Sequence, residues 1–369
     1  LHTKNKYSQT STQGTIIRPM KITNLILQNS YIMILAIGML LVIVSFNIDL
    51  SVGSITAFIG AMAAIFIVNL NMNYILAIIL VLIIGALAGA VQGLWVAYVK
   101  IPAFIVTLGG MLIYRGLSMT VLNGKSIGPF PKGFQNISSG FIPDYFNGTT
   151  FHLTSIFIGF TLTLIYILYE VYNRKNLLKY NFEVIAFNLL LAKIILISLA
   201  INAFIFSLAS YKGIPNVLVL LFILIVFYSF VGSKTVIGRH IYALGGNEKA
   251  ARLSGIKTKR LTFWVFVNMG VMCALSGIVF AARLNVATPK AGQGFELDAI
   301  AACFIGGAST AGGIGTIIGA IIGGLVMGVM NNGMSLIGVG IDLQQTIKGG
   351  VLLLAVAFDL FTKSRAAKG

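Results

Sequence analysis

Long apolar segments recur along almost the whole chain, and they constrain its fold more than any other feature. A helix needs roughly 20 apolar residues to cross a bilayer, and eight segments have about that length. They are residues 25–46, 51–70, 74–99, 102–122, 151–172, 184–208, 215–232 and 262–282. Only 9% of the 369 residues are charged, whereas soluble domains carry roughly 25%. The chain is therefore predicted to be an integral membrane protein, which excludes a soluble enzyme and a disordered chain.

The later apolar region, residues 297–330, is too long for one span. Five glycines interrupt it: Gly306, Gly307, Gly312, Gly313 and Gly315. We therefore expect two short helices, at about 297–309 and 313–330, followed by a last span at about 345–362. The predicted fold class is all-α: a polytopic transmembrane helix bundle with about 10–11 membrane helices, short broken helices included.

The basic residues predict the orientation. Lys and Arg total 26 against 9 Asp and Glu, a formal charge of +17, and cytoplasmic loops of membrane proteins collect Lys and Arg. The connections 233–261 and 173–182 and the tail 363–369 are basic, so we expect all three in the cytoplasm. An even number of spans must separate them, and splitting 297–330 satisfies this count. The charge therefore needs no nucleic-acid partner to explain it.

The same count places the polar N-terminal segment, residues 1–24, on the outer side. This segment is mildly basic, which conflicts with the preference of basic residues for the cytoplasmic side. A further span upstream of Leu1 would remove the conflict, and we expect one. Residues 25–362 are expected to form a single transmembrane domain.

The sequence offers little support for catalysis. Cys273 and Cys303 lie inside apolar segments, and the three histidines are scattered, so no metal centre or cofactor is expected. The segment Gly124-Lys125-Ser126 resembles the end of a phosphate-binding loop, but position 119 is Met where that loop requires Gly. The chain is therefore expected not to be an enzyme.

Polar residues near the span ends are candidates for a substrate pathway, since polar groups within membrane proteins usually face protein or water. The candidates are Asp49, Ser51, Asn331, Asn332 and Gln344. Asp49 and Asp298 could instead cap the helices that follow them. Gly315, Gly319 and Gly323 recur every four residues, a spacing typical of close helix packing.

The connection 233–261 contains a predicted short helix. Residues 248–253 are helix formers, Asn247 is a favourable N-cap, and Gly255 is placed to end the helix. The physical signals alone are equally compatible with a solvated loop helix that has no role.

Five segments of the chain resemble one family. The loop helix resembles the coupling loop of permease subunits of ABC sugar importers, in the ribose, xylose and multiple-sugar branch. Residues 47–54 resemble the family's Gly-Ile-Asp-Leu-Ser-Val-Gly-Ser, with Asn47 in place of the first Gly. The other matching segments are residues 295–302, 305–309 and 331–334.

The resemblance implies the type II-like importer fold and ATP-driven import of a monosaccharide. Residues 127–131 and the helix pair 151–208 look like the xylose or multiple-sugar members. The implied partners are an ATP-binding subunit that hydrolyses ATP, a periplasmic or lipoprotein sugar-binding protein, and a second permease subunit in the bacterial inner membrane. A homodimer is expected, although a heterodimer is compatible with the sequence.

The resemblance also implies which residues transmit the motion driven by ATP. The coupling residues would be Gly245, Gly246, Asn247, Glu248, Ala250, Ala251 and Gly255. The broader class has Glu-Ala-Ala-x-x-x-Gly here, and this chain has Lys249 at the Glu position.

Three other functions stay open. An ion-coupled secondary transporter would carry paired acids within its spans, and here most acids lie at span ends. The same family fold could import nucleosides, autoinducer-like sugars or amino acids. A structural or interaction-only membrane subunit is the third alternative.

Overall fold

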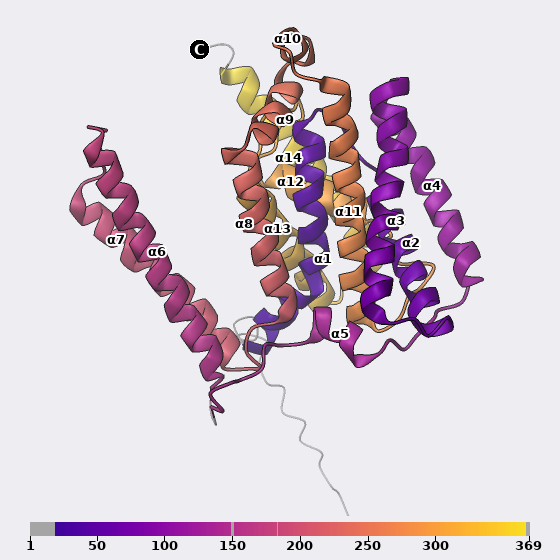
Figure 1. Ribbon diagram of the computed structural model, residues 1–369, viewed down its shortest axis with the longest axis horizontal. Helices are drawn as coiled ribbons and strands as arrows, with labels where there is room; N and C mark the ends of the chain where they lie inside the picture. Colours follow the sequence, from indigo (N-terminus) through magenta and orange to yellow (C-terminus); the bar gives the residue numbers. More distant parts are fainter. Residues whose placement is uncertain (1–18, 149–150, 183, 367–369) are drawn as a thin grey trace, which may run out of the picture. The chain divides into compact units, whose positions relative to one another are not determined.

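The computed structural model describes residues 19–148, 151–182 and 184–366 (Figure 1). In this part of the chain the secondary structure is helical, apart from two isolated β-bridges. The predicted all-α fold class is therefore confirmed. Of the expected polar segment 1–24, residues 1–18 lie outside the described residues, as do residues 367–369 of the expected tail.

Ten of the described helical segments are long and apolar enough to cross a membrane. They are α1 (Pro19–Val44), α2 (Val52–Ala64) with the π-helical turn η1 (Ile65–Asn69), α3 (Tyr74–Leu94) with the π-helical turn η2 (Trp95–Val99), α4 (Ala103–Leu122), α6 (Leu153–Lys179), α7 (Phe187–Ala209), α8 (Asn216–Lys234), α11 (Thr258–Leu284), α13 (Ile317–Leu336) and α14 (Ile341–Ala366). The shorter helices are α5 (Lys132–Ser139), α9 (Val236–Gly246), α10 (Glu248–Leu253) and α12 (Phe295–Ile305). Each predicted apolar segment thus contains a helix.

Tertiary contacts divide the chain into two units. The first comprises residues up to Ile26 and Phe141–Pro215, and its main feature is the hairpin of α6 and α7. Lys193 of α7 pairs with Glu170 of α6 at 2.6 Å. Asn202 Nδ2 donates to Thr163 Oγ1 at 2.8 Å. Polar contacts therefore join two helices whose outer faces are strongly apolar.

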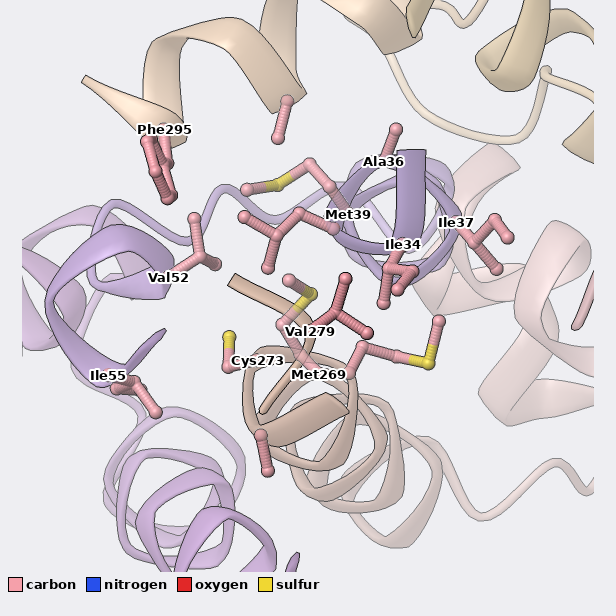
Figure 2. Close-up of a cluster of buried hydrophobic side chains, with 14 of the residues drawn as sticks. Ile34, Ala36, Ile37, Met39, Val52, Ile55, Met269, Cys273, Val279 and Phe295 are labelled. Carbon is pink, nitrogen blue, oxygen red and sulfur yellow. The ribbon is translucent and has the colours of Figure 1, made fainter. Parts of the chain in front are cut away.

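The second unit comprises Leu27–Gly140 and Asn216–Gly369. Its core forms where α1, α2 and α11 meet, with side chains that include Ile37, Ile55 and Met269 (Figure 2). A Cβ at Gly38 would lie 2.8 Å from Met269 Sδ, so α1 and α11 pack closely. Because lipid is as apolar as these side chains, tight van der Waals packing rather than water exclusion holds such helices together.

The small-residue stripe predicted from the sequence packs within the chain itself. A Cβ at Gly319 would lie 2.1 Å from the carbonyl oxygen of Gly306, and one at Gly323 would lie 1.9 Å from that of Ala302. These two glycines of α13 therefore allow close contact with α12, which confirms the packing interpretation for them. Gly315 lies ahead of the helix.

The predicted break in the late apolar region is also confirmed, and it is wider than expected. α12 ends at Ile305 and α13 begins only at Ile317. Gly307 and Gly312 have φ angles of +86° and +74°, which L side chains rarely adopt, so the helix cannot continue through this loop. We call residues 306–316 the break loop.

Two ends of the second unit can be followed in Figure 1. One end carries α9, α10 and the last turns of α14, and we call it the α10 end. The other carries α5, and we call it the α5 end. α9 was not anticipated as a separate helix, although Thr235 marks its start: the Thr235 side chain accepts from Gly238 N at 3.2 Å.

Candidate functional site

The predicted short helix in the connection 233–261 is α10. Asn247 Oδ1 accepts a hydrogen bond of 3.0 Å from Ala250 N, which is the expected N-cap. Gly255 has a φ of +86° and ends the helix, as expected. This local structure is confirmed.

The rotation of α10 decides which of its side chains a separate protein could contact. Ala251 is buried at 4% exposure and faces the chain itself, whereas Ala250 is exposed. Leu253 is 87% exposed. An apolar side chain this exposed on a six-residue helix is a feature that sequence reasoning missed, because a lone Leu in a basic loop gives no signal.

Gly245, at the end of α9, lies where three segments of backbone meet. A Cβ there would lie 1.6 Å from the carbonyl oxygen of Val44 and 2.7 Å from Gly313 N. Gly313 N in turn donates to Val44 O at 2.9 Å. The end of α1, the end of α9 and the break loop are therefore in direct contact. Gly246 has no such neighbour: its Cβ would meet nothing within 4 Å.

A side-chain bond strengthens this junction. The hydroxyl of Tyr242 donates to the carbonyl oxygen of Gly315 at 2.7 Å. Burial raises the pKa of Tyr242, so the hydroxyl keeps its proton and acts as a donor. α9 thus contacts the second half of the break loop, at Gly313 and Gly315.

Two of the five predicted pathway residues form a first polar cluster. Asp49 Oδ1 accepts from Ser51 N at 2.8 Å and from Ser51 Oγ at 2.6 Å, and Gln92 Nε2 donates to Ser51 Oγ at 2.7 Å. All three residues are buried. Asp49 thus binds the backbone amide that precedes α2, in partial agreement with the capping interpretation. Gln92 was missed, although it is a lone amide in the apolar segment 74–99.

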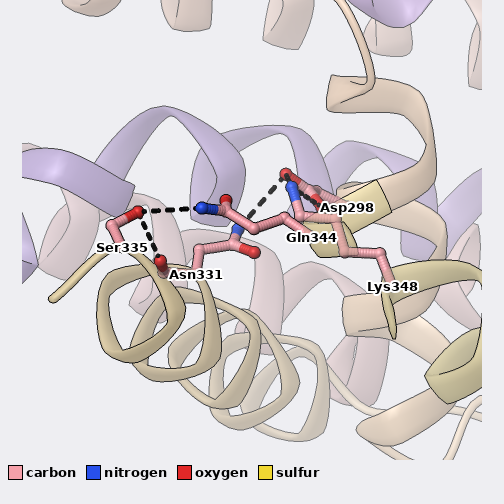
Figure 3. A network of polar contacts seen from close by, with 5 residues as sticks. All are labelled: Asp298, Asn331, Ser335, Gln344 and Lys348. Atoms are coloured by element: carbon pink, nitrogen blue, oxygen red, sulfur yellow. Dashed lines mark hydrogen bonds and ion pairs between the residues drawn. The ribbon is translucent and has the colours of Figure 1, made fainter. Parts of the chain in front are cut away.

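A second polar cluster joins α12, α13 and α14 (Figure 3). Lys348 Nζ lies 3.0 Å from both carboxylate oxygens of Asp298, and Asn331 Nδ2 donates to the same carboxylate at 3.4 Å. Gln344 Nε2 reaches Ser335 Oγ at 3.5 Å. The prediction that Asp298 caps α12 is wrong, because the N-cap is Gly294 and the Asp298 carboxylate pairs with Lys348 instead.

The predicted pathway residues therefore do not make one site. Asn332 lies apart from both clusters and donates to Gln28 Oε1 at 2.7 Å. Within the described residues, the buried acceptor atoms that lack a hydrogen-bond partner include Gln92 Oε1, Glu296 Oε2 and Asn331 Oδ1. A buried acceptor without a donor is costly, and a hydroxyl-bearing ligand would satisfy it. Among the same residues, no three or more His, Cys, Asp or Glu side chains gather where they could hold a metal ion.

Comparison with known proteins places this chain among transporters. The family described as "Branched-chain amino acid transport system / permease component" matches residues 21–356. The xylose transport system permease protein XylH of Haemophilus influenzae is 38% identical over 355 residues, covering 96% of this chain and 92% of that protein. The ribose import permease protein RbsC of Escherichia coli K12 is 35% identical over 336 residues, covering 91% and 84%. No solved structure matches.

These similarities extend over nearly the whole chain, and they confirm the resemblance stated from the motifs. A permease component of this class is a multi-pass protein of the bacterial cytoplasmic membrane, and ATP hydrolysis is carried out by a separate partner. The chain therefore belongs to the branched-chain amino acid transport system / permease component family, as the permease component of an ABC importer.

Proposed function

We propose that this chain forms the translocation pathway of an ATP-driven importer of monosaccharides, with xylose or several sugars as substrates. The observation that carries the proposal is the 38% identity to a xylose permease along 96% of the chain. A ribose permease at 35% identity supports a sugar substrate more broadly. The partners would be an ATP-binding subunit, a sugar-binding protein and a second permease subunit, a copy of this chain.

The α10 end would face the cytoplasm. Its connections carry a strong excess of basic residues, which favour that side. The connections 45–51, 100–102, 235–257 and 306–316 all reach this end if the spans alternate in direction, and residues from all four line one pocket. The α5 end would then receive the sugar from its binding protein.

The coupling surface would centre on the exposed face of α10. Ala250 and Leu253 would contact the ATP-binding subunit, because both are exposed and apolar. Ala251, buried within this chain, would anchor the helix rather than touch the partner. The coupling set proposed from the family comprises Gly245, Gly246, Asn247, Glu248, Ala250, Ala251 and Gly255, to which the exposure of Leu253 adds one residue.

Motion at α10 would reach the membrane through the junction of Gly245 with Val44 and Gly313. Val44 leads directly into the connection that carries Asp49 and Ser51. Gly313 lies in the break loop between α12 and α13. Both polar clusters would therefore respond to a displacement of α9.

The sugar would exchange hydrogen bonds with these clusters during passage. Gln92 Oε1 and Asn331 Oδ1 are buried acceptors without donors, and sugar hydroxyls are donors. We therefore keep Asp49, Ser51, Asn331, Asn332 and Gln344 as pathway candidates and add Gln92.

Uptake into sealed vesicles tests the proposed function. Vesicles would contain this permease with its ATP-binding subunit and sugar-binding protein, and radiolabelled xylose would be the first substrate. We expect uptake that requires ATP, survives a protonophore, and is reduced by competing ribose if several sugars are carried. Uptake abolished by the protonophore with ATP present would favour an ion-coupled transporter. Competition by leucine or a nucleoside, but by no sugar, would overturn the sugar assignment.

The coupling surface has its own test. Leu253→Glu places a charge on the exposed face of α10 and should abolish both co-purification with the ATP-binding subunit and ATP-driven uptake. Ile337→Glu is a matched control, since Ile337 is 79% exposed and follows α13. This control should retain the ATP-binding subunit. Normal co-purification and uptake with Leu253→Glu would show that α10 does not dock there.

A further inference from the structure

The α10 end contains a cavity of about 1020 Å³ that borders the proposed coupling surface. Its walls come from η2, the start of α4, the α9–α10 turn and the start of α11, with further residues from the connection after α1 and from the break loop. From α10 it receives Glu248, Lys249 and Arg252, whereas Ala250 and Leu253 do not line it. The cavity therefore adjoins the proposed docking face: Gly245, Gly246, Asn247 and Glu248 of the coupling set line it, whereas the exposed apolar residues of that face lie outside it.

The cavity is strongly basic. Six cationic side chains line it: Lys100, Lys249, Arg252, Lys257, Lys259 and Arg260. Glu248 is the single acidic residue of the lining, so six positive charges minus one leave an excess of five. Within the part of the chain that the structure describes, none of the six forms an ion pair. Unpaired like charges around one hollow raise the local concentration of anions.

Two helix N-termini at the rim of the cavity also favour the binding of anions. α4 begins after Pro102 and α11 begins after Lys257, and neither N-cap residue accepts a side-chain hydrogen bond from its helix. Amides in the first turn of a helix are donors without intrahelical partners, and they favour negatively charged oxygen atoms. The residues of both first turns, Ala103 and Thr258–Arg260, line the cavity.

The remaining wall is apolar and lies where spans end. Val96, Ala97, Ile101 and Pro102 line it beside Tyr98, which is 48% exposed. Trp95, one turn earlier on the same helix, is equally exposed. Trp and Tyr concentrate at the membrane interface, where lipid headgroups lie. A basic hollow with an apolar wall at this depth matches a phosphodiester joined to a hydrocarbon chain better than it matches a free anion.

We propose that this cavity binds the headgroup of an anionic phospholipid. The phosphate lies among Lys100, Lys259 and Arg260, and the glycerol and first methylenes lie against the wall formed by Val96 and Ile101. Lys249 and Arg252 of α10 contact the same headgroup. Bound lipid therefore ties α10 to the starts of α4 and α11, and it sets how firmly the coupling helix is held.

Lipid titration of the purified chain tests this proposal. Thermal unfolding in a neutral detergent would be followed while phosphatidylglycerol, cardiolipin, phosphatidylcholine or inorganic phosphate is added. We expect stabilisation by the two anionic lipids at concentrations where phosphatidylcholine and inorganic phosphate have no effect. The variant Lys100→Gln/Lys259→Gln should weaken the apparent affinity for cardiolipin about tenfold or more.

A matched variant separates this site from general charge attraction. Lys132→Gln/Lys290→Gln removes two exposed lysines outside the cavity and should bind cardiolipin as the wild type does. Equal weakening in both variants would overturn the proposal, because any two charges would then serve. Stabilisation by inorganic phosphate equal to that by lipid would assign the cavity to a free anion. If neither variant alters lipid binding and Lys100→Gln/Lys259→Gln instead loses the ATP-binding subunit, the occupant is an acidic protein surface.

Discussion

The hydroxyl of Tyr242 on α9 donates a 2.7 Å hydrogen bond to the carbonyl oxygen of Gly315, 73 residues further along the chain. This bond reaches the end of the break loop, two residues before α13 begins at Ile317. Together with the contact of Gly245 against Val44 and Gly313, it makes α9 the element through which the α10 connection and the interrupted membrane helices meet. Displacement of α9 must therefore break these contacts or carry the break loop with it.

Removal of the Tyr242 hydroxyl should weaken transport more than it weakens folding. Tyr242→Phe keeps the ring but leaves the Gly315 carbonyl without this donor, at a cost of about 1 kcal/mol. We expect ATP-driven uptake to fall roughly fivefold, with little change in the amount of protein in the membrane. Tyr172→Phe removes an exposed hydroxyl and is the control. Unaltered uptake by Tyr242→Phe would show that the bond transmits nothing.

Alanine variants of the adjacent residues Gly245 and Gly246 test the packing at the end of α9. Gly245→Ala would place a methyl group 1.6 Å from the Val44 carbonyl oxygen, so the backbone must shift. Gly246→Ala meets nothing within 4 Å. We expect Gly245→Ala to lower the thermal midpoint by several degrees and to abolish uptake, and Gly246→Ala to preserve the thermal midpoint. Equal behaviour of the two variants in thermal unfolding would contradict the described packing.

The ion pair between Asp298 and Lys348 should behave as a coupled unit. Replacing one member leaves a buried charge unpaired, which typically costs about 3–5 kcal/mol. Asp298→Asn and Lys348→Met should therefore each lower the thermal midpoint more than the double variant does. Lys290→Met, at an exposed position, controls for loss of a lysine. If the two single effects simply add in the double variant, the pair does not interact in solution.

The stability that Asp144 contributes in the connection before α6 should depend on pH. Burial alone would raise the pKa of Asp144, but hydrogen bonds from Thr154, Gly148 and Phe146 lower it well below its ordinary value. A lowered folded-state pKa contributes stability that is present above the unfolded value of about 3.9 and is lost as the pH falls through the folded value.

Asp144→Asn tests this dependence. The variant should lower the thermal midpoint by a constant amount from about pH 8 to pH 5, and the difference should shrink below about pH 4. Asp342→Asn, an exposed acid at the start of α14, controls for net charge. A difference that grows as the pH falls would reverse the assigned sign.

Local signals were predictable from the sequence, and long-range contacts were not. Asn247 and Gly255 act on neighbouring residues, so their sequence positions predict where α10 begins and ends. The glycines of the break loop are equally local, because a positive φ stops a helix wherever it occurs. Apolar length predicted the spans for the same reason, since each span depends on its own residues.

The candidate sites depended on pairs that lie far apart in the chain. Asp298 and Lys348 are 50 positions apart, and Ser51 and Gln92 are 41 apart. No periodicity connects such residues, so Asp298 was assigned to a cap. The same limit applies to α10: its rotation, which buries Ala251 and exposes Leu253, depends on packing against other segments rather than on its six residues.

The pair of Glu170 with Lys193 has a consequence for biogenesis. A lysine within an isolated membrane helix costs free energy to insert, about 2.5–3.5 kcal/mol at the helix centre, and Lys193 is the seventh residue of α7. α6, made first, carries the matching acid. If either helix enters the bilayer alone, its charged side chain lies in lipid without a partner. If the two helices enter side by side, Glu170 and Lys193 pair and neutralise each other. The translocation machinery would accordingly release α6 and α7 into the bilayer as a preassembled hairpin.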